Sequence, residues 1–309
     1  MGGQGTRRSM ERVLVEKYYE TGRGVHDRHP TTIRRRTQVA RPDPRSDRGS
    51  GSYARQMSRL FEELGRAPTP IGEISLRRRL EPVLQVDLFE IKIGEDGLMS
   101  SLITDGEEAV ATLGLAASDR TDLDVVVGGL GLGHTAHTAL RDDRVRSLVV
   151  VEALEPVIDW HRRRLTPLGG ELSDDPRCSF LHADFFDLAR TGVEPLDGRV
   201  DVLLLDIDHS PRHLLDPTNA DFYGADGSAR LAAALRPGGV FSLWSNDPPD
   251  DVYVSVLRSA FASVVAETVT FPNPLTGGET SSTVYVATRP MVDRPDGSAA
   301  TATDVGPAG

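Results

Sequence analysis

The stretch Asp124-Val-Val-Val-Gly-Gly-Leu-Gly-Leu-Gly133 decides the fold of this chain. Its three β-branched valines form a short apolar run that is typical of a fully buried parallel strand. Glycine lets a backbone approach a ligand closely, and a helix expected to end near Leu140 would offer free N–H groups at its start. The stretch therefore predicts a strand, a ligand-binding turn and a helix. The glycines of the turn are Gly128, Gly129, Gly131 and Gly133.

A second apolar run follows at 148–151 and ends at Glu152. A strand, a glycine turn, a helix and a second strand with a carboxylate at its tip are typical of a nucleotide-binding βαβ unit. The carboxylate can accept hydrogen bonds from both hydroxyls of a ribose. Because Glu152 is expected at a strand tip, we expect the fold to survive its replacement.

From Leu123 onward, predicted strands alternate with predicted helices, which indicates a mostly parallel sheet. The last two strands are joined by a loop too short for a crossover helix, so they must be antiparallel neighbours. Trp160 and His161 are expected in packing and at the surface. Further strands are expected at 177–182, 200–206, 240–244, 266–271 and 280–288, and helices at 156–165, 221–235 and 252–261.

The segment ahead of the glycine turn predicts a small antiparallel β region, with a helical turn at 59–64. A helix at 105–115 follows, with Thr104 or Asp105 expected as its cap. We divide the chain into a disordered basic tail (1–58), the small β region (59–103), a nucleotide-binding catalytic domain (104–290) and a second disordered tail (291–309). The strands of the small region are expected at 73–80, 87–93 and 98–102.

Composition excludes several classes of protein. No run of about 18 apolar residues occurs, so no transmembrane helix is expected. The net charge of −11 argues against a nucleic-acid surface over most of the chain. Cys178 is the only cysteine, so no internal disulfide is expected and the cytoplasm is the expected compartment.

The antiparallel hairpin that closes a parallel sheet resembles the class I S-adenosylmethionine-dependent methyltransferase fold, a Rossmann-like α/β fold with a seven-stranded sheet. The resemblance implies that the methionine part of the cofactor lies over the glycine turn and that Glu152 holds the ribose. It also implies that Asp184, followed by Phe185, holds the adenine amino group.

A closer resemblance is to the spermidine synthase family, which moves an aminopropyl group instead of a methyl group. The small β region, the Gly-Gly-x-Gly-x-Gly turn, Glu152, Asp184 and Arg236-Pro-Gly-Gly239 all occur in the family's order. Two departures concern the acceptor site. Gly131 stands where the family carries an aspartate that meets the transferred amine, and Asp206-Ile-Asp208-His209 replaces the family's Asp-x-x-Asp-Pro.

Asp206, Asp208 and His209 follow the fourth strand, where the sulfonium carbon of the donor should lie. An amine must lose a proton before it attacks that carbon, so an adjacent carboxylate or imidazole is useful. We expect Asp208 or His209 to be the base and Asp206 to contact the cofactor and orient the acceptor's ammonium. The donor implied is S-adenosylmethionine or its decarboxylated form, and the transferred group is aminopropyl or methyl.

Two alternatives stay open. One is a methyltransferase that uses magnesium for O-methyl transfer, because Asp206, Asp208, Asn246 and Asp247 form an oxygen-rich set; our main hypothesis has no metal. The other is a non-catalytic subunit that only binds the nucleotide, against which the intact acidic tip of the fourth strand argues. The partners expected are a small amine acceptor and a second copy of the chain in a homodimer, with neither nucleic acid nor a membrane.

Overall fold

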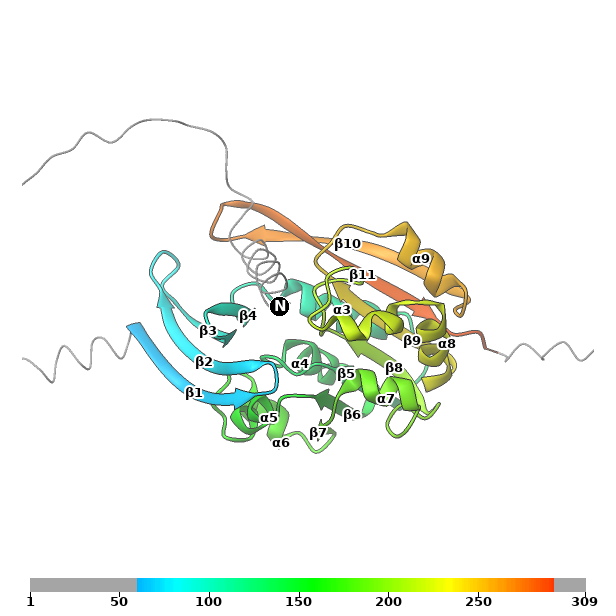
Figure 1. Ribbon diagram of the computed structural model, residues 1–309, viewed down its shortest axis with the longest axis horizontal. Coiled ribbons are helices and arrows are strands. Elements are labelled where there is room, and N and C mark those ends of the chain that lie inside the picture. Colours follow the sequence, from blue (N-terminus) through cyan, green and yellow to red (C-terminus); the bar gives the residue numbers. More distant parts are fainter. Residues whose placement is uncertain (1–59, 292–309) are drawn as a thin grey trace, which may run out of the picture.

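The computed structural model describes residues 60–291, which form two β-sheets and the helices that cover the larger one (Figure 1). The tails predicted at 1–58 and 291–309 lie outside this range, apart from residue 291. Within the described range, no helix is both long and apolar enough to cross a bilayer.

The smaller sheet is antiparallel, with its four strands in chain order. The helical turn predicted at 59–64 is wrong, because this segment begins a strand that pairs with the next one; Phe61 lies opposite Arg79. Pairing with β2 thus overrides the local preference of this segment, and an ion pair between Arg78 and Glu62, at 3.0 Å, also joins the two strands. The strands are β1 (Phe61–Thr69), β2 (Gly72–Glu81), β3 (Val86–Ile93) and β4 (Asp96–Ser100).

The larger sheet confirms the predicted architecture. Its order is β10-β11-β9-β8-β5-β6-β7, with β5 to β9 parallel and the β10–β11 hairpin antiparallel. Strand β9 begins five residues earlier than the start at 240 predicted for it, because Leu235 already pairs with Val200. The strands are β5 (Leu123–Gly128), β6 (Val145–Glu152), β7 (Cys178–His182), β8 (Val200–Leu205), β9 (Leu235–Ser245), β10 (Ser263–Asn273) and β11 (Gly278–Thr288).

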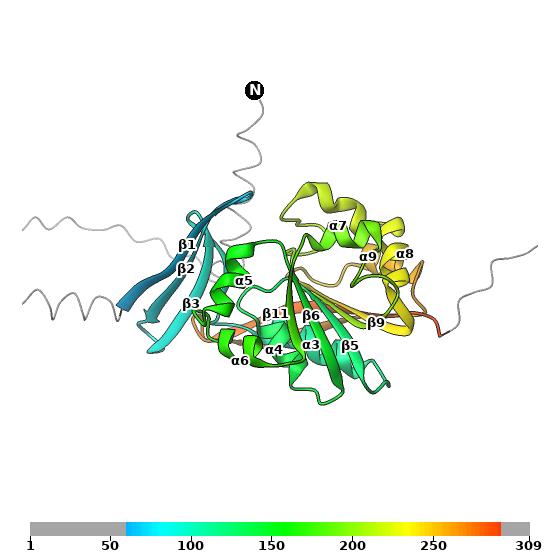
Figure 2. The same cartoon turned by 90° about the horizontal axis from the view of Figure 1, so that it is seen from below.

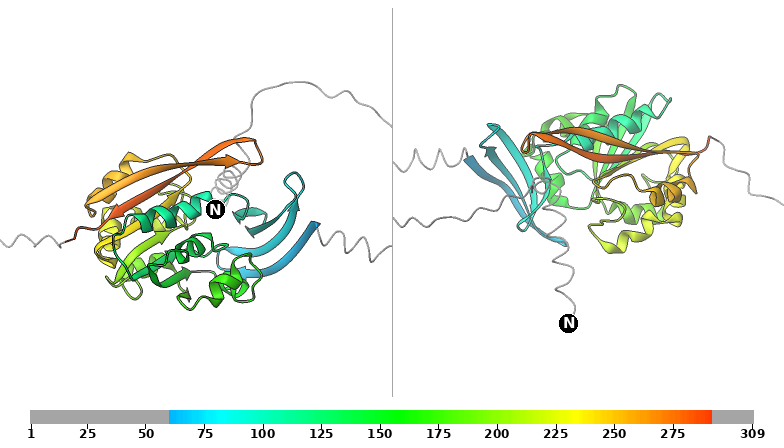
Figure 3. Two further views of the ribbon diagram at one scale, coloured as in Figure 1. Left: turned by 180° about the vertical axis from the view of Figure 1, so that it is seen from behind. Right: turned by 90° about the horizontal axis from the view of Figure 1, so that it is seen from above.

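Helices cover both faces of this sheet, as Figure 2 and the two views of Figure 3 show. One face carries α3 (Asp105–Ala116), α4 (His134–Leu140), α5 (Glu155–Arg162) and α6 (Gly169–Asp174). The other carries α7 (Phe185–Thr191), the 3₁₀ helix η1 (Pro217–Tyr223), α8 (Ala225–Ala234) and α9 (Asp251–Arg258).

Three local predictions differ from the structure. Helices α6 and α7 were not expected, since both are short and lack a clear apolar period. The helix predicted at 221–235 is divided, because Gly224 is extended between η1 and α8. Thr104 is the N-cap of α3 but makes no capping bond with its side chain; its hydroxyl donates to Glu108 instead.

The smaller sheet packs through α5 against the domain that holds the larger sheet. Ile74, Leu76 and Ile91 belong to the same buried cluster as Trp160, as expected for a packing tryptophan. A side chain at Gly65 would collide with the Trp160 ring, so β1 can lie directly on α5 only because residue 65 is glycine. This packing sets β4 beside the carboxyl ends of the parallel strands.

Candidate functional site

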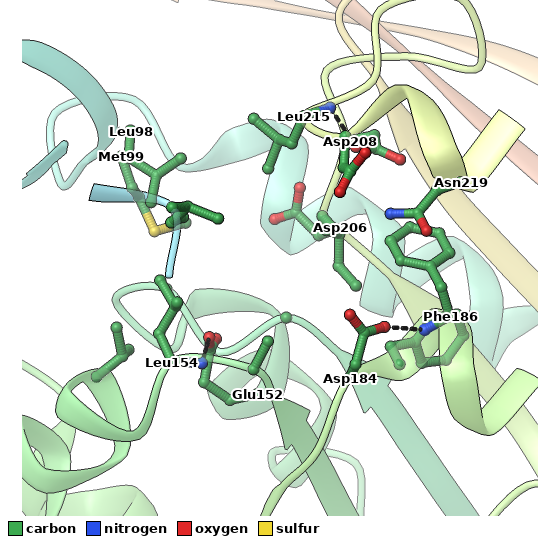
Figure 4. Close-up of a pocket in the computed structure, with 18 of the residues that line it drawn as sticks. Leu98, Met99, Glu152, Leu154, Asp184, Phe186, Asp206, Asp208, Leu215 and Asn219 are labelled. Atoms are coloured by element: carbon green, nitrogen blue, oxygen red, sulfur yellow. Dashed lines mark hydrogen bonds between the residues drawn. The ribbon is translucent and has the colours of Figure 1, made fainter. Parts of the chain in front are cut away.

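A cavity lies at the carboxyl ends of β5, β6 and β8, between these strands and the smaller sheet (Figure 4). In an open α/β sheet, this is where ligands bind. Eight of the predicted site residues line it: Gly129, Gly131, Glu152, Asp184, Phe185, Asp206, Asp208 and His209.

The glycine turn forms the floor of the cavity, and its backbone requires glycine. Gly129 has a φ of +91°, and a Cβ there would lie 2.5 Å from the carbonyl oxygen of Asp206. The turn and the end of β8 are therefore in close contact. Gly128 and Gly133 do not line the cavity: Gly128 ends β5, and Gly133 caps α4.

Glu152 is built into the turn as well as into the cavity. Its Oε2 accepts a hydrogen bond from the Leu130 N–H at 2.9 Å, and its Oε1 accepts one from the Leu154 N–H at 2.8 Å. The residue is only 8% exposed, and burial raises the pKa of its carboxyl group. Glu152 therefore holds two backbone segments together, so we expect its loss to lower the stability of the fold, a cost that its place at a strand tip did not reveal. The N–H groups of Gly131 and Ala153 also face this carboxylate, and Glu152 still lines the cavity.

Asp184 links the cavity to α7. Its Oδ1 accepts from the N–H groups of Phe186 and Asp187, at 2.8 and 3.2 Å, so it is the N-cap of that helix. Figure 4 shows its other oxygen turned toward the cavity. Phe185 and Phe186 stand edge to face against Phe222, which gives this end of the cavity a firm aromatic wall suited to a flat base.

The carboxyl end of β8 carries the side chains that are expected to orient and deprotonate the acceptor amine. Asp206, Asp208 and His209 all line the cavity. Asp208 is 2% exposed; its Oδ1 accepts from the Leu215 N–H at 2.7 Å and its Oδ2 from the Tyr223 hydroxyl at 2.8 Å. Burial raises the pKa of Asp208. Asp208 thus holds the 215–223 segment over the site.

Sequence reasoning missed several cavity residues. Asp216 and Asn219 come from the start of η1, and the Asp216-Pro217 pair is an N-cap signal that could have located it. Met99 enters from the smaller sheet and Trp244 from the end of β9, and no local signal marks either as a site residue.

The charges around the cavity have one sign. Among the described residues that line it there is neither lysine nor arginine. The cavity therefore favours a cationic ligand over an anionic one. Its acidic members are Glu152, Asp184, Asp206, Asp208 and Asp216.

The structure does not bring the proposed magnesium ligands together. Asp206 and Asp208 line the main cavity, whereas Asn246 lines a second hollow and Asp247 a third. Asp247 is instead bonded to His213 and Ser210. Between residues 60 and 291, no three His, Cys, Asp or Glu side chains are grouped to hold a metal ion.

His161 is not at the surface, as was expected of it, but fully buried behind the glycine turn. Its Nε2 lies 2.9 Å from the Gly131 carbonyl oxygen and its Nδ1 3.1 Å from the Thr166 hydroxyl. A neutral ring can donate to the first group and accept from the second. Burial lowers the pKa of His161 to about 4, so the neutral form is maintained at pH 7.

This lowered pKa predicts a pH-dependent stability. His161 binds a proton more readily in the unfolded chain, so the stabilisation it gives is complete above about pH 6.5 and is lost as the pH falls toward 4. Between about pH 7.5 and pH 5, the unfolding free energy of the wild type should fall by about 2 kcal/mol more than that of His161→Gln.

Urea denaturation of both proteins at the two pH values measures this difference. Glutamine keeps an N–H donor for the Gly131 carbonyl but does not titrate, so it is the matched control. An equal fall in both proteins would contradict the prediction.

Comparison with known proteins gives matches at the level of structure. No protein-family model matches this chain, and no curated protein does. The solved structure of spermidine synthase from Thermotoga maritima is similar, with a TM-score of 0.57, 19% identity and 74% of each chain covered. A spermidine synthase in complex with the transition state analogue AdoDATO has a TM-score of 0.56 and 17% identity, over 74% of this chain and 73% of that one. The chain has a spermidine synthase-like fold.

Proposed function

We propose that this protein is a transferase that takes an alkyl group from a nucleoside sulfonium donor of the S-adenosylmethionine class and gives it to a small amine. The observation that carries the proposal is the ring of five carboxylates around one cavity at the glycine turn, without a lysine or arginine among its described lining residues.

The nucleoside half of the donor has a defined place in this proposal. Glu152 accepts the ribose hydroxyls, and Asp184 accepts the adenine amino group beside the aromatic wall of Phe185 and Phe186. The sulfonium then lies over the glycine turn, opposite Asp206. Such positioning of the amine in line with the sulfonium carbon is the main contribution an enzyme makes to alkyl transfer.

The charge of the cavity favours the decarboxylated donor and hence aminopropyl transfer. Decarboxylated S-adenosylmethionine and a diamine acceptor are both cationic, whereas S-adenosylmethionine also carries a carboxylate. The AdoDATO complex of the similar spermidine synthase is a second support for an aminopropyl donor.

Calorimetry tests the proposal with S-adenosylmethionine, its decarboxylated form and methylthioadenosine. The expected result is binding of methylthioadenosine and of the decarboxylated donor, followed by product formation in a screen of diamines. Binding without turnover of any amine would favour the nucleotide-binding subunit, and transfer of a methyl group would favour a methyltransferase. Absence of all binding would overturn the proposal.

A further inference from the structure

The cavity has two unlike walls, which Figure 4 shows on opposite sides of Glu152. The β8 side carries Asp206 and Asp208. The side formed by β4 and the start of α5 is apolar. Its members are Leu98, Met99, Leu154 and Val157.

Met99 reaches from the smaller sheet onto the glycine turn. Its Sδ accepts a hydrogen bond from the Leu132 N–H at 2.8 Å, and it occupies the place where a side chain at Gly131 would begin. Gly131 has a φ of +47°, so glycine suits this backbone as well as this contact. The thioether of Met99 thus covers the turn at the point where any side chain on residue 131 would begin.

The N–H groups of the turn all have partners within the chain. Gly129 donates to Val151, Leu130 to Glu152, Leu132 to Met99 and Gly133 to Leu130, and the Gly131 N–H faces Glu152. A carboxylate above this turn would therefore meet neither a cation nor an unpaired N–H group. An anion held in that way pays its desolvation cost without compensation.

We propose that Met99 is a specificity-determining residue, which makes the subsite above Gly131 apolar so that it accepts the methylene chain of a donor without a carboxylate and rejects one that carries it. This inference rests on the proposed function, because it concerns the tail of the same donor. The tail's methylenes lie against Met99, and its terminal ammonium is directed toward the acidic wall at Asp206.

The test is a ratio of affinities measured by calorimetry on the full chain. Wild type should bind decarboxylated S-adenosylmethionine at least about tenfold more tightly than S-adenosylmethionine, the order expected for one unpaired charge. Met99→Lys places an ammonium over the turn, so it should shift this ratio toward S-adenosylmethionine by about tenfold or more. Met99→Leu is the matched control: leucine cannot accept from the Leu132 N–H either, but its side chain still covers the turn, so the wild-type ratio should be kept.

Methylthioadenosine lacks the aminopropyl or methionine chain of the two donors. Its binding therefore distinguishes a failure of the proposed function from a failure of the role of Met99. All three proteins should bind it equally, because Met99 does not contact the nucleoside in this scheme. If wild type does not bind it, the proposed function fails and this inference fails with it. If wild type binds it but Met99→Lys leaves the donor ratio unchanged, only the role of Met99 is overturned.

A merely structural role of Met99 would weaken all three ligands together and leave their ratios constant. If Met99→Lys does not fold, Met99→Ala takes its place. Alanine uncovers the turn and releases the Leu132 N–H, so the ratio should again move toward S-adenosylmethionine, and an unchanged ratio would refute the inference.

Discussion

Asp208→Asn should lower turnover by about 10²–10⁴-fold, the contribution of a general base to proton transfer, while nucleoside affinity stays near that of the wild type. Burial raises the pKa of Asp208, which makes it a better proton acceptor than an ordinary carboxylate. Asparagine can still accept from the Leu215 N–H, so the segment that Asp208 holds should remain in place. The measurement is steady-state turnover with the amine found by screening.

The pH profile separates a base from a structural residue. Raising the pH should partly restore Asp208→Asn, because more of the amine is then already neutral. Tyr223→Phe removes the hydroxyl that donates to Asp208 but leaves the carboxylate, so it should keep most of the activity. Both variants failing alike, without recovery at high pH, would show that Asp208 only supports the loop.

Variants of His209 and Asp206, at the same end of β8, test the roles expected of these two residues. If Asp208 is the base, the turnover of His209→Gln should stay within a few-fold of the wild-type value. A large loss of turnover in His209→Gln, with Asp208→Asn near wild type, would instead make His209 the base. Asp206→Asn should raise the KM for the amine, since its carboxylate is expected to orient the ammonium. A chelator added to wild type tests the magnesium hypothesis directly, because only a metal-dependent enzyme would lose activity.

The fold could be predicted because its signals are local. A fully buried parallel strand must be a continuous apolar run, and the β5 residues Val125 to Val127 form one between an acidic residue and a glycine turn. The antiparallel hairpin followed from the shortness of the loop between β10 and β11. Strand β1 was missed as a whole, since only its pairing with β2 makes it a strand.

The site residues, too, fall into those that local sequence signals could place and those that depend on tertiary packing. Glu152 ends β6, Asp184 lies two residues after β7, and Asp206 directly follows β8. Because parallel strands bring their carboxyl ends to one edge of the sheet, these positions in the chain were enough to place the three residues together. Met99 could not be found in this way, because its position depends on how a separate sheet packs against α5. The burial of His161 depends likewise on α6 and the glycine turn, which meet only in the folded chain.

Glu152→Ala should weaken nucleoside binding by about 1.5–3 kcal/mol and should also lower the unfolding free energy. The second effect follows from the structure: alanine leaves the N–H groups of Leu130 and Leu154 without their acceptors, which costs about 1–3 kcal/mol for each buried group. A loss of affinity alone could therefore reflect a disturbed turn instead of a lost contact with the ribose.

A comparison of two ligands distinguishes these causes. Wild type should bind methylthioadenosine more tightly than its 2′,3′-dideoxy analogue, because Glu152 accepts from the hydroxyls that the analogue lacks. In Glu152→Ala that preference should disappear, since the acceptor is absent, while any disturbance of the turn weakens both ligands equally. If the variant keeps the full wild-type preference for the hydroxylated ligand, Glu152 supports the glycine turn and another group holds the ribose.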